Sequence, residues 1–204
     1  MTKLIVCAAL MFGFAGELAA QPDATMIELV KPIAFYPDSL VAQVLAASTH
    51  PEEIVKAEAW LHGDRPWDSR ELAQEVDGTT WSPGIKALAL TRPVLDAMSG
   101  DLVWTKALGQ AYARNPAAVM SAVQALRHAA QAAGELISTS GARVVLSGAT
   151  ILLEPVDGQF VYVPGRGVFD VAAYERFSWG WHGWQPGWKD GVVRYQDTPY
   201  LSQH

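Results

Sequence analysis

The residues best able to contact a ligand form an aromatic run near the C-terminus of this 204-residue chain. The segment FSWGWHGWQPGW (177–188) contains four of the eight tryptophans, with three glycines between them. The four are Trp179, Trp181, Trp184 and Trp188. Flat indole rings stack on the faces of sugars, so these four are candidate ligand-binding residues for a cell-wall glycan. Each ring also buries a large apolar area, so packing inside the protein is the alternative, and we favour it.

The spacing of the residues gives little support for metal binding, nucleophilic catalysis or phosphate binding. The five histidines show no HxxxH, HExxH or Cys/His pattern, so we predict no metal site. The residues from Ser48 to Glu53 include hydroxyls, a histidine and carboxylates, but one local stretch cannot readily aim three groups at one atom, so helix capping explains them better than a catalytic triad does. The segment PGRGVFD (164–170) lacks the glycines and the Lys-Ser/Thr pair of a phosphate loop. We therefore predict no catalytic residue, no metal and no cofactor.

The first twenty residues carry the features of an export signal. Lys3 precedes an apolar stretch from Leu4 to Ala15, and small residues follow it up to Ala20. Twelve apolar residues are too few to span a bilayer, which needs about twenty. The single cysteine, Cys7, lies inside this segment, so the exported protein would contain no disulfide. We predict a signal peptide over 1–20 and a bacterial protein that is periplasmic or secreted.

The charge of the chain limits its partners. Fifteen basic and 21 acidic residues give a formal net charge of −6, and the basic residues form no run. This balance argues against binding to nucleic acid and to anionic lipid. The aromatic run is too short, and too broken by glycine and proline, to cross a membrane, so we predict no transmembrane span after signal cleavage. Peripheral contact of the run with a membrane surface stays an alternative.

The rest of the chain must position these residues, and its periodicity changes once. Residues 21–137 carry the helical spacing of apolar side chains, interrupted by capping signals such as Thr49 with Glu52 and Asp68 with Glu71. Residues 138–167 contain three β-branched runs, the first two joined at Ser147-Gly148. Residues 168–204 are rich in glycine and tryptophan. We predict a mainly α fold, in which six or seven short helices are followed by a small antiparallel β-meander and an irregular aromatic tail.

Several segments resemble one known family in order and spacing. They include PIAFYPD (32–38), WSPGIKAL (81–88) and the VYVP motif (161–164). On these motifs the chain resembles domain-of-unknown-function family 3300, a family of exported bacterial proteins. The tail after the VYVP motif is shorter and more charged than in the family pattern. The family has no established activity, so the resemblance implies no catalytic residue.

These observations lead to one main functional hypothesis and two alternatives. The main one is a non-enzymatic structural or interaction module of the bacterial envelope, with an envelope protein or a cell-wall glycan as partner. The first alternative is a glycan- or peptidoglycan-binding module, which requires at least two of the four indoles to lie exposed and coplanar in a groove. The second is an envelope hydrolase, which requires a pocket where a carboxylate such as Asp38 or Asp101 converges with a histidine.

Overall fold

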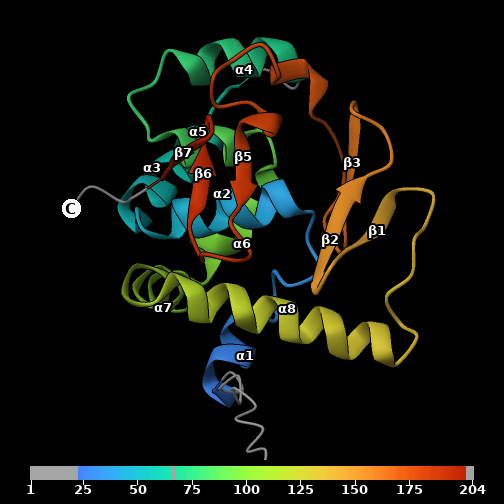
Figure 1. Cartoon of the computed structure of the whole chain (residues 1–204). Helices are drawn as coiled ribbons and strands as arrows, with labels where there is room; N and C mark the ends of the chain where they lie inside the picture. The colour runs from blue at the N-terminus through green and yellow to red at the C-terminus, as the bar shows by residue number, and fades with distance from the viewer. Residues whose placement is uncertain (1–22, 66–67, 201–204) are drawn as a thin grey trace, which may run out of the picture.

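The computed structural model describes residues 23–65 and 68–200, so the predicted signal peptide (1–20) lies outside the described residues. Within these described ranges, eight α-helices come first, ahead of every strand (Figure 1). They are α1 (Ala24–Val30), α2 (Asp38–Ser48), α3 (Pro51–Leu61), α4 (Ser69–Asp77), α5 (Pro83–Ala89), α6 (Arg92–Gly100), α7 (Leu102–Arg114) and α8 (Pro116–Ala132).

Seven short strands and two single-turn 3₁₀ helices follow the helical array. The strands are β1 (Ala142–Ser147), β2 (Thr150–Pro155), β3 (Phe160–Val163), β4 (Gly167–Asp170), β5 (Trp184–Pro186), β6 (Val193–Tyr195) and β7 (Thr198–Pro199). The 3₁₀ helices are Ala172–Tyr174 and Trp181–Gly183. This order confirms the predicted mainly α class, with small antiparallel sheets and an aromatic C-terminal region.

Side-chain caps and prolines separate the helices. The carboxylate of Asp68 accepts hydrogen bonds from the N–H groups of Arg70 and Glu71, which confirms the cap predicted for α4. The cap predicted at Thr49 is wrong, because α3 begins at Pro51 and the Thr49 hydroxyl donates backwards to Ala46. Such back-bonding to the preceding turn competes with capping of the next helix.

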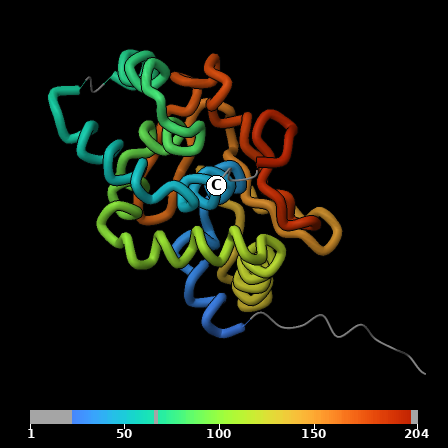
Figure 2. Tube along the Cα trace, turned by 90° about the vertical axis from the view of Figure 1, so that its left-hand side faces the viewer, coloured from blue at the N-terminus to red at the C-terminus, as the bar shows by residue number. Residues whose placement is uncertain are grey.

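Helix α2 forms the centre of the molecule. Nine of its eleven residues, Leu40 to Ser48, are buried. It contacts α3, α5 and α7 in the helical array and β5 in the C-terminal sheet. The turned view in Figure 2 shows this helix between the other helices and the C-terminal segment. Gly109 allows α7 to pack close against the end of α2, because a Cβ at this position would lie 2.1 Å from the Ser48 carbonyl oxygen.

The strands pair differently from the predicted three-stranded meander. The pairs β1–β2 and β3–β4 form two separate antiparallel sheets, and β5–β6–β7 form a third. The predicted two-residue hairpin between β1 and β2 is present, but its loop is Gly148-Ala149, one residue later than predicted, because Ser147 pairs with Thr150. Gly148 has a φ of +63°. The tail is also more regular than predicted, since β4 and the third sheet belong to it.

Side chains of the helices occupy the outer edge of β2 and explain the absence of a third strand there. The Gln124 amide donates to the Ile151 carbonyl at 3.0 Å and accepts from the Ile151 N–H at 2.9 Å. Asp38 accepts from the Leu153 N–H at 3.1 Å. Because these groups take the hydrogen bonds that a neighbouring strand would make, β3 pairs with β4 instead.

Candidate functional site

Three of the four tryptophans in the aromatic run belong to the hydrophobic core. The exposed fractions of Trp179, Trp181 and Trp184 are 2%, 1% and 0%. The Trp179 indole N–H donates to Asp77 at 2.8 Å, and the Trp184 N–H donates to the Trp179 carbonyl at 3.1 Å. Packing therefore accounts for these three residues, and they offer no exposed face to a sugar.

Trp188 is the member of the run that keeps an exposed surface. It lines two surface hollows, of about 290 and about 330 Å³. The smaller one also contains Asp38, Glu154 and Gln185. The Trp188 N–H donates to Asp38 at 2.8 Å, and the guanidinium of Arg127 lies 4.6 Å from the centre of its ring. Of the four candidate ligand-binding residues, Trp188 alone remains available for stacking.

Arg127 joins this tryptophan to the rest of the fold, and the sequence interpretation missed it. Its side chain has no exposed surface and donates to Asp38 at 2.7 Å. It also donates to the carbonyls of Ala34, Tyr36 and Ile151, at 2.8, 3.0 and 2.8 Å. Burial lowers the pKa of Arg127, and the adjacent charge of Asp38 opposes that shift. The network thus connects α2, α8, β2 and the aromatic tail.

The position of Arg127 on α8 could have identified it from the sequence as a buried residue with partners inside the protein. It follows Met120 by seven residues and Val123 by four, so it lies on the same buried stripe of the helix. A charged residue on a buried stripe requires partners inside the protein. Asp38, at the end of the PIAFYPD motif, is that partner.

The two carboxylates named for a hydrolase do not meet a histidine within the described residues. Asp38 is engaged by Arg127, Leu153 and Trp188. Asp101 caps α7 by accepting from the Trp104 N–H, and it lines a hollow of about 190 Å³. No histidine lines the hollow of either residue.

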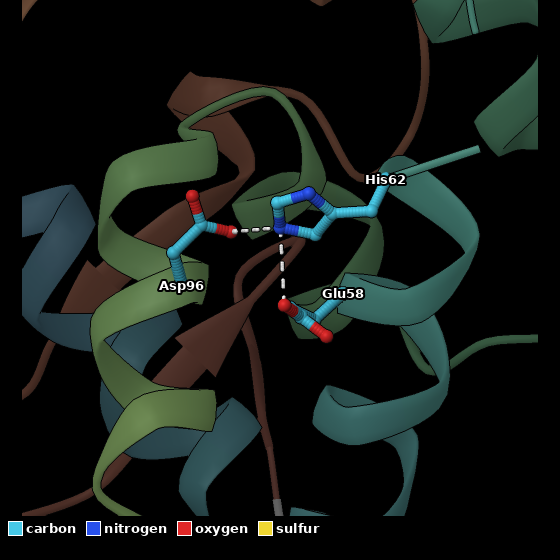
Figure 3. A group of neighbouring side chains, drawn as sticks. All are labelled: Glu58, His62 and Asp96. Carbon is cyan, nitrogen blue, oxygen red and sulfur yellow. Dashed lines mark ion pairs between the residues drawn. The ribbon is translucent and has the colours of Figure 1, made fainter. Parts of the chain in front are cut away.

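Carboxylates and a histidine converge elsewhere, on the outer surface of α3 and α6 (Figure 3). The Nε2 atom of His62 lies 3.0 Å from Glu58 Oε1 and 3.9 Å from Asp96 Oδ1. Glu58 lies in the last turn of α3, and His62 is the C-cap residue that follows the helix in α-helical conformation, so the two side chains lie on the same face of its end. Asp96 comes from α6, which packs against α3.

A third feature is an apolar groove between α8 and the two hairpins. Its volume is about 360 Å³, and Glu135 is the one charged residue among those lining it. The lining residues are Phe35, Pro37, Ala130, Glu135, Leu136, Ile137, Thr139, Ala142, Val144, Leu153, Tyr162 and Pro164. Ile137 is 66% exposed and Tyr162 is 41% exposed. Leu146, Phe160 and Val168, on the hairpins, are further exposed apolar side chains.

These features define a mainly helical domain with an apolar groove and a tryptophan-rich C-terminal segment. Among the described residues, no helix is long and apolar enough to cross a membrane. The family described as Protein of unknown function (DUF3300) matches residues 23–201, and the chain belongs to this family.

A relative in Escherichia coli (strain K12) is named Uncharacterized protein YacH. The two are 33% identical over 155 residues, which cover 70% of this chain and 25% of YacH. The chain thus spans about a quarter of the length of this relative. No solved structure matches the chain.

Proposed function

We propose that this protein is a non-enzymatic interaction module of the bacterial envelope, periplasmic or secreted, that binds an apolar segment of an envelope protein. The groove beside the hairpins carries this proposal. Apolar side chains dominate its lining, and Ile137 and Tyr162 remain largely exposed. Contiguous apolar surface on a soluble domain is typical of a protein-binding site.

Contacts along the strand edges favour recognition through side chains over addition of a strand. Thr139 donates its N–H to the Ala142 carbonyl at 2.8 Å, and the Val144 N–H donates to Ser138 at 3.0 Å. The first half of the outer edge of β1 is therefore already paired. A partner in the groove would gain its binding energy from apolar burial, not from main-chain hydrogen bonds.

Charge favours a neutral or basic partner. Glu135 is the charged group of the groove lining, and the whole chain has a formal net charge of −6. An acidic partner would be repelled, whereas a lysine or arginine beside the apolar segment would pair with Glu135.

Photo-crosslinking in living cells tests the groove. A photoreactive residue is placed at Tyr162 inside the groove, and at Val103 on α7 as a control. Val103 is 84% exposed but does not line the groove. We expect a protein adduct from position 162, with the crosslink mapping to an apolar segment of an envelope protein, and none from position 103. Ile137→Asp should abolish the adduct.

The same experiment can contradict the proposal. Equal adducts from positions 162 and 103, an adduct at a charged segment, or no protein adduct at position 162 would each count against a groove-bound apolar segment. Export is tested separately by fusing alkaline phosphatase to the chain. Phosphatase activity should depend on residues 4–15, and activity that persists after their deletion would contradict export through this segment.

Burial of three indoles removes the two-ring platform that the glycan-binding alternative required. Cell-wall glycan stays a second candidate partner only through Trp188, which retains an exposed surface between polar groups. Gln185 lies in the same hollow and is separate from the Arg127 network. We expect the protein to sediment with purified cell-wall sacculi, and Gln185→Ala and Trp188→Phe to weaken that association. Absence of sedimentation by the unmodified protein would remove this candidate.

A further inference from the structure

The geometry points to a binding site for a divalent transition-metal ion at Glu58, His62 and Asp96. The site lies outside the groove and is independent of the proposed partner. One oxygen from each carboxylate and a ring nitrogen of His62 all lie within 4.8 Å of one another. Figure 3 shows the two carboxylates approaching the same ring nitrogen from two helices.

The spacing of these atoms fits a small metal ion. Ligand bonds of about 2.0–2.2 Å place neighbouring donors of a tetrahedral zinc site roughly 3.3 Å apart. The Nε2 atom of His62 is 3.0 Å from the Glu58 oxygen and 3.9 Å from the Asp96 oxygen. His62 is 65% exposed and Asp96 is 44% exposed, so small rotations of these side chains can equalise the distances.

The donor types select the class of metal. An imidazole nitrogen with two carboxylate oxygens suits zinc and its neighbours in the first transition row, whereas calcium and magnesium prefer sites built from oxygen. Two carboxylates also balance a charge of +2. His62 and Asp96 line a surface hollow of about 380 Å³, which leaves room for water to complete the coordination.

Neighbouring arginines hold the end of α3 in place. Arg92, in the first turn of α6, donates to the carbonyl of Leu61, the last residue of α3. Arg65 donates to the Trp60 carbonyl at 3.2 Å, and its guanidinium lies 3.8 Å from the centre of the Trp60 ring. The Arg92 contact joins α6 to the end of α3, and the Arg65 contacts hold the segment that follows α3 against it. A fixed backbone reduces the ordering that a metal must impose.

Isothermal titration calorimetry with zinc sulfate on the untagged, chelator-treated protein tests this site. We expect one zinc ion per chain, at least tenfold weaker binding in His62→Gln and in Asp96→Asn, and no displacement of zinc by excess magnesium. The matched control is His182→Gln. His182 pairs with Glu175 at 2.8 Å and is 58% exposed, but in the part of the chain that the structure describes no second carboxylate completes a set of three donors there. Zinc binding should be unchanged in this variant.

A second measurement separates binding from an effect on folding. The imidazole resonances of His62 should shift on addition of zinc, while those of His182 should not. The variants replace exposed side chains, so their unfolding temperatures without metal should match that of the unmodified protein. Absence of zinc binding, binding that survives His62→Gln, or an equal loss in His182→Gln would overturn the proposal.

Discussion

Replacing Arg127 by methionine should test whether its network holds the helical array and the aromatic tail together. Methionine keeps an unbranched apolar side chain but removes four hydrogen bonds, one to Asp38 and three to main-chain carbonyls. It leaves the carboxylate of Asp38, 16% exposed, without its positive partner. Removing one member of a buried ion pair costs about 3–5 kcal/mol. Because Leu153 and Trp188 still donate to Asp38, we expect the lower half of that range.

A double-mutant cycle isolates the interaction between the two charges. Asp38→Asn removes the negative charge, so the Arg127→Met/Asp38→Asn variant contains no uncompensated buried ion. We expect its loss in the free energy of unfolding to be smaller than the sum of the two single losses by about 2 kcal/mol. Urea unfolding followed by tryptophan fluorescence measures each value.

The control for this cycle is Arg143→Met. Arg143 is exposed on β1 and donates to the Val156 carbonyl at 3.4 Å. Its replacement should cost no more than about 0.5 kcal/mol. A loss below about 1 kcal/mol in Arg127→Met, or strict additivity in the cycle, would refute the view that this network ties the elements together.

Three further changes test the packing of the core. Gly109→Ala gains about 1 kcal/mol in helix propensity, but its Cβ would lie 2.1 Å from the main-chain oxygen of Ser48. Overpacking costs about 1–3 kcal/mol, so we expect a clear net loss of stability by urea unfolding, and a gain would contradict this contact. Gln43→Met should raise the free energy of unfolding by about 1 kcal/mol, because both amide atoms of Gln43 are buried and find no hydrogen-bond partner among the described residues; a loss would show that the amide is paired. Burial raises the pKa values of Tyr112 and Tyr174 above the ordinary value of 10.0. Protonated tyrosine therefore stabilises the fold fully below pH 10.0, and this contribution is lost as the pH rises toward the folded pKa values. Stability should fall between about pH 9 and about pH 11, with a smaller fall in Tyr174→Phe, and an identical fall in that variant would contradict the assignment.

Local signals in the sequence predicted the helices because each signal acts within one or two turns. Asp68 caps α4 as expected, and a two-residue turn that contains Gly148 joins β1 and β2. The pairing of β3 could not be predicted in the same way. It depends on Gln124 and Asp38, which reach β2 only after the chain has folded.

The candidate sites show the same difference between local sequence signals and contacts that form only in the folded chain. Burial of Trp179, Trp181 and Trp184 agrees with the favoured packing interpretation, and Asp38 lay inside a recognised motif. Glu58 and His62 show a helical spacing that was visible in the sequence, but Asp96 joins them only through the packing of α3 on α6. The proposed metal site draws its donors from two separate segments, so it has no continuous sequence pattern.

The amide of Gln124 also has a consequence for solubility. An open strand edge beside exposed apolar side chains would be a template for another copy of the chain, and such edges promote aggregation. Gln124 hydrogen-bonds to both main-chain groups of Ile151, so the side chain of a single residue covers this part of the strand edge. The exposed apolar side chains of the hairpins therefore lie beside an edge that another copy of the chain cannot extend at Ile151.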